Sequence, residues 1–351
     1  MADGGGRRAY NGGGRRAYIG SFTTAGGRGI LTAAVDPDNG ALTVLGAHKG
    51  RPDPSWLALS GDMLYAVSET PDGAIAAYRL DGDRLEPAGP PVRVGGGPTH
   101  LSLHAGHVLT ADYGSGSVTA VPLRAGGALA ESASGVLRHE GSGPVPRRQE
   151  GPHAHQVQPD PSGRWVVSVD LGTDSVRVCA LQDGILRLYR ETPLPAGSGP
   201  RHLAFHPDGD RAYVLNELTP TITVCRWDAA AGLLEPVTET PVLPDPPTGD
   251  AYPSGIVASP DGRFVWTATR GQDLLSVLAV EGDGLRPVAA VPCGGVWPRA
   301  IALSKGMPEE FLYVANERSG EVTWFALDRE TGLPRRGGSV EAPAASCVAF
   351  G

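Results

Sequence analysis

The chain has 351 residues, including 50 glycines and 32 prolines spread along its length, and its formal net charge is −8. This acidic balance argues against a nucleic-acid-binding protein, which carries a basic face. The sequence also lacks the run of about 18 apolar residues that a membrane span requires, and its frequent Gly and Pro residues predict many short strands joined by turns.

The first 14 residues are rich in glycine, and the segment GGGRRAY at 4–10 recurs at 12–18. No apolar stretch follows either arginine pair, as an export signal would need, so we expect a flexible tail over residues 1–14 and a cytoplasmic protein. Four cysteines are scattered without CxxC spacing: Cys179, Cys225, Cys293 and Cys347. They predict buried free thiols rather than a zinc site or a disulfide framework.

One pattern recurs through the chain: a small residue or Pro, two variable positions, an apolar strand, a turn and a second apolar strand. Six copies begin at residues 54, 98, 154, 200, 253 and 298, so the spacing is 44 to 56 residues. The copy at 200–217 reads PRHLAFHPDGDRAYVLNE, and two further strand-like runs follow it, ITVCRWD and LLEPVTET. Four strands per unit at this period are typical of a propeller blade.

The two ends of the chain supply a seventh unit. The N-terminal part contains RAYIGSFT, GILTAAVD and ALTVLGAH but lacks the first strand of the pattern, and AASCVAFG at 344–351 is that strand alone. Pairing of the C-terminal strand with the N-terminal blade would close the ring and remove its exposed sheet edges. We therefore predict an all-β protein in which residues 15–351 form one seven-bladed propeller, with four antiparallel strands per blade.

Charged residues recur at two positions of the repeat. The residue that opens the first strand is Ser55, Thr99, His155, Arg201, Ser254, Arg299 or Ser346. The residue that ends the second strand is Phe22, Glu69, Tyr113, Leu171, Glu217, Arg270 or Glu317. In a propeller the first strand lines the central channel, and antiparallel pairing places both positions at the same end of it. We therefore predict a site at one mouth of the channel, because convergent polar groups in a concavity are the usual form of a binding site.

Other polar residues carry less information. His153 and His155 stand at i and i+2 of a predicted strand and would share a face. Such a pair is half of a metal site, but no third ligand has suitable spacing, so we expect no metal. Three further histidines are expected at the surface or in turns: His100, His104 and His107. Asn216, beside Glu217, either braces the strand end or contacts substrate.

Several segments resemble the lactonase family of seven-bladed propellers: GPHAHQVQPDPSGRW, GPRHLAFHPDGDRAYVLNE, the Arg in TATRG, and YVANERSGEVTWFALDRETG. That family includes the bacterial propeller-type 6-phosphogluconolactonase and the fungal carboxymuconate lactonising enzyme. The resemblance extends from about residue 15 to 351 and is strongest over 152–335. It implies the propeller fold, whereas family members differ in activity. Residues 114–150 depart from the family pattern as a long insertion, which we expect to overhang the mouth.

The resemblance also implies a set of catalytic residues. They are His155 (or His153), Arg201, Glu217 and Arg270, which the repeat register places at the mouth independently. The same register adds possible substrate contacts: His153, Asn216, Arg299, Glu317 and Glu69.

These residues suit metal-independent hydrolysis of a small anionic lactone of the sugar-acid type. Glu217 would be the general base toward water and His155 would protonate the leaving alkoxide. Arg201 and Arg270 would hold the anionic group of the substrate and stabilise the oxyanion. The same groups could instead close a lactone on an unsaturated diacid, or serve another cyclase or isomerase of secondary metabolism. A non-enzymatic binding module is the second alternative. We expect no cofactor, no nucleic-acid or membrane partner, and a monomer or a weak homodimer.

Overall fold

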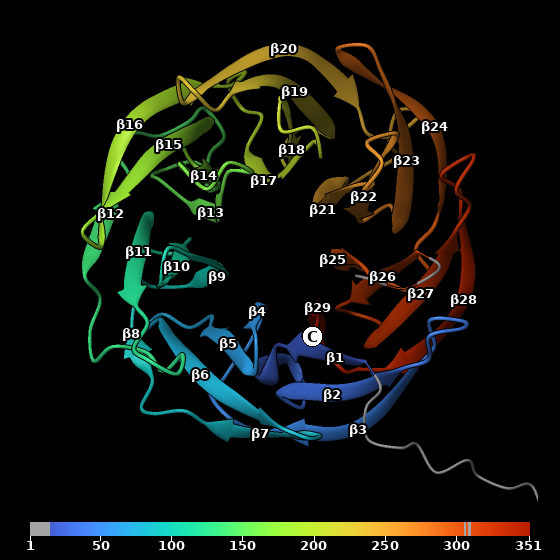
Figure 1. Ribbon diagram of the computed structural model, residues 1–351. Helices are drawn as coiled ribbons and strands as arrows, with labels where there is room; N and C mark the ends of the chain where they lie inside the picture. The colour runs from blue at the N-terminus through green and yellow to red at the C-terminus, as the bar shows by residue number, and fades with distance from the viewer. Residues whose placement is uncertain (1–14, 305–306, 308–309) are drawn as a thin grey trace, which may run out of the picture.

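The chain forms a ring of seven sheets around a central channel, as Figure 1 shows in a view along the ring axis. The structure, a computed structural model, describes residues 15–304, 307 and 310–351. The predicted tail over 1–14 therefore lies outside the described residues. Within the described part of the chain, no helix is long and apolar enough to cross a membrane. The prediction of seven blades of antiparallel strands is confirmed.

Each blade contains four main strands, numbered here in chain order. Blade 1 consists of β29 (Ala345–Phe350), β1 (Arg16–Ser21), β2 (Ile30–Val35) and β3 (Leu42–His48), with the short 3-10 helix η1 (Thr23–Ala25) after β1. Blade 2 consists of β4 (Leu57–Ser60), β5 (Met63–Ser68), β6 (Ala74–Asp81) and β7 (Arg84–Pro87), and β8 (Val92–Arg93) also pairs with β6. Blade 3 consists of β9 (Pro98–His104), β10 (His107–Asp112), β11 (Ser117–Pro122) and β12 (Gly135–Arg138).

The other four blades follow the repeat without interruption. Blade 4 consists of β13 (Ala154–Pro159), β14 (Val166–Asp170), β15 (Ser175–Gln182) and β16 (Ile185–Pro193). Blade 5 consists of β17 (Pro200–Phe205), β18 (Arg211–Asn216), β19 (Thr221–Asp228) and β20 (Leu233–Pro241). Blade 6 consists of β21 (Tyr252–Ala258), β22 (Phe264–Arg270), β23 (Leu274–Glu281) and β24 (Gly284–Pro292). Blade 7 consists of β25 (Pro298–Leu303), β26 (Phe311–Asn316), β27 (Glu321–Leu327) and β28 (Pro334–Glu341).

Blade 5 illustrates why the repeat folds in this way. Five of the six residues of β18 are buried, because both faces of the strand pack against neighbouring blades, whereas most residues of the outermost strand β20 are exposed. The hairpin from β17 to β18 turns at the segment HPDG, where Gly209 has a φ of +75° that a residue without a Cβ adopts at little cost. The apolar faces of adjacent blades then form the core, as where Val167 and Val169 of blade 4 pack in one cluster with Val214.

The C-terminal strand closes the ring, as the incomplete N-terminal unit predicted. β29 pairs antiparallel with β1, with Tyr18 opposite Ala349 and Ile19 opposite Val348. The seam is also packed from the other side, because Ile19 belongs to one buried cluster with Tyr313 of blade 7. Blade 1 is therefore built from both ends of the described chain, and β29 takes the innermost place that the first strand occupies in the other blades.

A bulge recurs in the innermost strands. In six of the described blades, the register between the first and second strand skips one residue at the channel mouth: Ser346, Thr99, His155, Arg201, Ser254 and Arg299. In blade 2 the equivalent Ser55 lies just before β4. A bulged residue has no partner in the ladder, and the local distortion redirects its side chain. The fold thus presents a ring of side chains at one end of the channel, and some of them also connect neighbouring blades, as Thr99 and Ser254 do.

Candidate active site

The two predicted rings of residues meet at one mouth of the channel. A hollow of about 200 Å³ there is lined by Glu69, Thr99, Tyr113, Arg148, His155, Glu217, Arg270 and Arg299. Except for Arg148, which lies on the loop before β13, its residues come from the bulged positions of the first strands and from the ends of the second strands of several blades. Arg201 lies immediately beneath this hollow, where it contacts Glu217. The structure therefore brings together the four residues that the sequence selected as catalytic.

Glu217 is the centre of the charge network. Its Oε2 lies 3.0 Å from Nε of Arg201 and 2.7 Å from Nη2 of Arg270, and its Oε1 accepts a hydrogen bond from Arg148. The Glu217 side chain is only 6% exposed, so this is no surface ion pair of the kind that contributes little to stability. Burial alone would raise the pKa of the Glu217 carboxyl, but the charges of Arg270 and Arg201 hold that pKa well below its ordinary value.

Two arginine N–H groups beside Glu217 lack an aligned acceptor. Nε of Arg201 and Nη2 of Arg270 are close to the carboxylate in distance but form no hydrogen bond of good geometry with any described residue. Arg201 is held from its other end, where Nη1 donates to the carbonyl of Ser254. The Arg270 residue lines the hollow, whereas its Nη2 is buried against Glu217, so an oxyanion meets this donor only when the contact with Glu217 rearranges.

His155 is a neutral imidazole. Burial, and after it the charge of Arg201, lower the pKa of His155 well below its ordinary value, and the carboxylate of Glu217 offsets only part of this shift. Nδ1 of His155 has no hydrogen-bond partner among the described residues. The lowered pKa favours the neutral imidazole, which has a lone pair that can accept a proton, but it also makes His155 a weaker base than an ordinary histidine.

A second ion-pair group lies beside the first. Arg299 is 3.3 Å from Glu69 and 3.4 Å from Glu317, and its guanidinium lies over the ring of Phe22, 4.6 Å from the centroid. Ser55 donates a hydrogen bond to Glu69. Burial raises the pKa of Glu69 more than Arg299 lowers it. Of the predicted substrate contacts, Glu69 and Arg299 line the hollow, whereas Glu317 reaches it only through Arg299.

Two of the predicted substrate contacts have other partners. His153 precedes β13, and its ring stacks on that of Tyr113 at a centroid distance of 4.3 Å, while its Nδ1 contacts the Tyr113 carbonyl. The expectation that His153 and His155 share a strand face is wrong, because the bulge at His155 breaks the alternation. Asn216 is fully buried and its amide donates to Thr221 and Thr223. It braces the end of β18, and neither residue lines the hollow.

Sequence reasoning missed Arg148 and underrated Tyr113. Arg148 lies in the predicted insertion, whose first part provides β11 and β12 of blade 3 and whose last part crosses to the mouth. The sequence feature that could have indicated Arg148 is the pair of arginines in VPRRQE, shortly before the strand that carries His155. Tyr113 occupies the repeat position of Glu217, and its place at the mouth follows from the same register.

The base of the mouth is formed by aromatic rings. His100, expected at the surface or in a turn, is instead buried, with its ring 4.4 Å from that of Trp56 and 5.7 Å from that of His202. The cause is its position directly after the bulge at Thr99, which turns its side chain into the channel. Beyond these rings a largely apolar cavity of about 910 Å³ extends through the rest of the channel. The charged mouth is therefore separated by these rings from a more apolar part of the channel.

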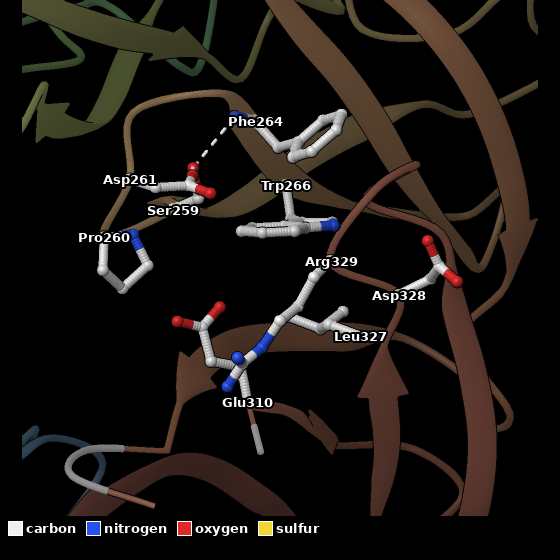
Figure 2. Close-up of a pocket in the computed structure, with 9 residues that line it drawn as sticks. All are labelled: Ser259, Pro260, Asp261, Phe264, Trp266, Glu310, Leu327, Asp328 and Arg329. Atoms are coloured by element: carbon white, nitrogen blue, oxygen red, sulfur yellow. Dashed lines mark hydrogen bonds between the residues drawn. The ribbon is translucent and has the colours of Figure 1, made fainter. Parts of the chain in front are cut away.

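Another hollow, of about 360 Å³, lies between blades 6 and 7 at the opposite end of the strands (Figure 2). Two of its acidic side chains, Asp261 and Asp328, stabilise their own turns. Asp261 accepts from the hydroxyl of Ser259 at 2.7 Å and from the backbone of Arg263, and Asp328 accepts from the backbone N–H groups that follow it. Such contacts are typical of side chains that stabilise turns. The mouth, where acid, base and cation converge, is the better candidate site.

The fold and the mouth together define a class: a seven-bladed propeller with an arginine-rich pocket around a buried carboxylate at one end of its channel. The family model described as "Lactonase, 7-bladed beta-propeller" matches residues 16–350. The chain therefore belongs to this lactonase family of seven-bladed β-propellers, and the resemblance noted in its sequence is confirmed.

Individual relatives match over almost their full length. The chain is 34% identical over 342 residues to a 6-phosphogluconolactonase of Bacillus subtilis, an alignment that covers 95% of this chain and 97% of the relative. A solved structure of a Lactobacillus plantarum protein has 30% identity and a TM-score of 0.90, with 96% of this chain and 99% of the other covered. The periplasmic gluconolactonase of Pseudomonas aeruginosa has 30% identity and a TM-score of 0.87, with 96% and 98% covered.

Proposed function

We propose that the protein hydrolyses a small sugar-acid lactone at the mouth of its channel. The observation that carries this proposal is one pocket lined by both an imidazole, His155, and an arginine, Arg270. Hydrolysis of a cyclic ester needs these two functions, a group that accepts a proton from water and donors that stabilise the oxyanion. The names of the relatives, 6-phosphogluconolactonase and gluconolactonase, support the same reaction.

The protonation states favour a different division of roles from the one expected from sequence. Glu217 is a poor base, because the surrounding arginines stabilise its ionised form. We assign the first proton transfer to His155, which takes a proton from the attacking water as the water oxygen bonds to the lactone carbonyl carbon. When the ring C–O bond breaks, the imidazolium returns this proton to the leaving alkoxide. The ionised Glu217 stabilises the transient imidazolium, and Arg270 donates to the oxyanion.

The proposal is tested with purified protein and three substrates: 6-phosphogluconolactone, glucono-1,5-lactone and a muconate-type diacid. Lactone opening is followed by pH-stat against the spontaneous rate in the same buffer. Enzymatic opening of either lactone supports the proposal. Consumption of the diacid alone would support the lactone-forming alternative, which uses the same residues. No turnover of any of the three, with binding still detectable, would favour a non-enzymatic binding module.

Metal independence is part of the proposal. Within the described residues, no three His, Cys, Asp or Glu side chains are grouped so as to hold a metal ion. We expect dialysis against EDTA to leave the rate of lactone opening unchanged. A loss of rate that a divalent ion restores would contradict the proposal. A cytoplasmic location and a monomeric or weakly dimeric state remain predictions from the sequence.

The pH dependence of kcat/KM should follow the protonation of His155. Because its pKa is lowered, the neutral, proton-accepting form persists below the ordinary histidine pKa of about 6.5. We expect kcat/KM to stay level as the pH falls from 8 through about 6.5 and to decline only in more acidic buffer, as the imidazole becomes protonated. His155→Gln should lower kcat by about 10²- to 10⁴-fold and remove this acidic limb. An unchanged rate in that variant would assign the base elsewhere.

A further inference from the structure

The backbone of the loop that carries Arg148 is held in place by Gln149, whereas the Arg148 side chain is partly exposed to solvent. Gln149 is fully buried, and its amide donates to the carbonyl of Leu171 at 2.8 Å and to Asp174 at 2.7 Å. Its backbone N–H donates to the carbonyl of Val145 at 2.9 Å. These contacts hold the backbone of Arg148 over the mouth, while the long Arg148 side chain remains 33% exposed.

Arg148 is the accessible member of the cations around Glu217. The side chains of Arg201 and Arg270 are 3% and 8% exposed, and both belong to strands of the propeller. Arg148, by contrast, reaches Glu217 from the solvent side. It also interacts with the hydroxyl of Tyr113, which contributes to the pKa shifts of both groups. Any ligand that enters the hollow from the mouth therefore meets Arg148 before it meets Glu217.

The charges at the mouth leave a positive excess. Arg148, Arg201, Arg270 and Arg299 lie among three carboxylates, those of Glu69, Glu217 and Glu317. A buried cluster with one more cation than anions attracts an anion, and Nη2 of Arg270 already lacks an aligned acceptor within the hollow. Arg148 can supply further donors to an anion bound there, because guanidinium groups bind phosphate and carboxylate oxygens through paired donors.

We propose that Arg148 exchanges its Glu217 partner for an oxyanion group of the substrate, a phosphate or a carboxylate, and thereby determines the preference of the site for charged lactones. This inference rests on the proposed lactonase function. Substrate binding then has a second effect on the site. Glu217 loses one of its three arginine contacts when Arg148 moves, which leaves more of its negative charge to stabilise the imidazolium of His155.

The test compares two lactones that differ in one charged group, 6-phosphogluconolactone and glucono-1,5-lactone. We expect Arg148→Gln to reduce the ratio of kcat/KM values, charged over neutral lactone, by about 10- to 100-fold, the effect of losing one hydrogen bond to a charged group. Arg148→Lys should restore part of the ratio because it keeps the charge. Arg147→Gln is the matched control, since Arg147 is the exposed neighbour on the same loop, and it should keep the ratio of the unmodified protein.

Equal losses for both lactones in Arg148→Gln would overturn the proposal and make Arg148 a mere support for Glu217. A calorimetric titration with inorganic phosphate, and a parallel one with acetate, provides a measurement without turnover. Arg148→Gln should weaken whichever anion binds by about 10-fold or more, whereas Arg147→Gln should not. Unweakened binding in Arg148→Gln would reject the proposal. If the protein opens neither lactone yet binds phosphate through Arg148, the lactonase function fails and the anion site stands.

Discussion

Glu217→Gln is expected to lose both turnover and stability. The amide removes the counter-charge of three arginines at once, and leaving buried charges without their partner costs about 3–5 kcal/mol of the free energy of unfolding. We expect the rate of lactone opening to fall on the order of 10²-fold or more, because the imidazolium of His155 loses its stabilising anion. Stability falls together with turnover because Glu217 is buried among Arg201, Arg270 and Arg148.

Melting temperature and rate should be measured on the same samples. Glu235→Gln is the matched control, since Glu235 lies on the outermost strand of the same blade and is exposed. A surface change of this kind is expected to stay within about 0.5 kcal/mol.

Since the pKa of Glu217 is lowered in the folded protein, its contribution to stability is complete above the pKa of the unfolded chain. This contribution declines as the pH falls below the pKa of the unfolded chain, and it is fully lost once the pH has fallen through the folded value. The difference in the free energy of unfolding between the unmodified protein and Glu217→Gln should therefore be constant near neutral pH.

A melting temperature equal to that of the unmodified protein would show that the arginines tolerate a neutral neighbour, and the charge network would then need another counter-ion. An unchanged rate together with a lowered melting temperature would leave Glu217 a structural residue. The chemistry would then have to be sought at Glu69 and Arg299, the other charged pair that lines the same hollow.

Removal of residues 345–351 should abolish soluble expression. These residues form β29, which pairs with β1 and so joins the two ends of the ring. Without it β1 becomes an unpaired inner edge, and exposed, largely apolar edge strands are prone to aggregation. Removal of Gly351 alone is the control, because this residue follows β29 and is exposed. A soluble truncated protein with a cooperative thermal transition would show that blade 1 holds together with three strands.

The blades and the ring positions could be predicted because they depend on local features. Pairs of apolar strands joined by short turns recur at a similar spacing, so aligning the copies also aligned His155, Arg201 and Glu217. The bulges could not be predicted in this way. They shift the alternation by one residue, which is why His100 lies in the channel and His153 does not share a face with His155.

Arg148 could not be placed because its position depends on contacts between distant segments. It lies on an irregular loop with no equivalent in the other blades, so the repeat register says nothing about its location. The loop is fixed by Gln149, whose amide reaches Leu171 and Asp174, 22 and 25 residues further along the chain. The protonation state of His155 was inaccessible for a similar reason, because it depends on burial and on the charge of Arg201 in the next blade.

The recurring bulge in the innermost strands has a consequence for how such proteins diversify. A residue that pairs with nothing in the ladder can be exchanged without changing sheet register, so the mouth can acquire new chemistry while the scaffold stays the same. Blades 4, 5 and 7 hold His155, Arg201 and Arg299 at this position, whereas Thr99, Ser254 and Ser346 occupy it elsewhere. Thr99 and Ser254 donate hydrogen bonds to carbonyls of the next blade, so an exchange there also removes a contact between blades. Ser346 has no hydrogen-bond partner among the described residues, and it is the position at which one substitution can add an acid, a base or a cation to the existing scaffold.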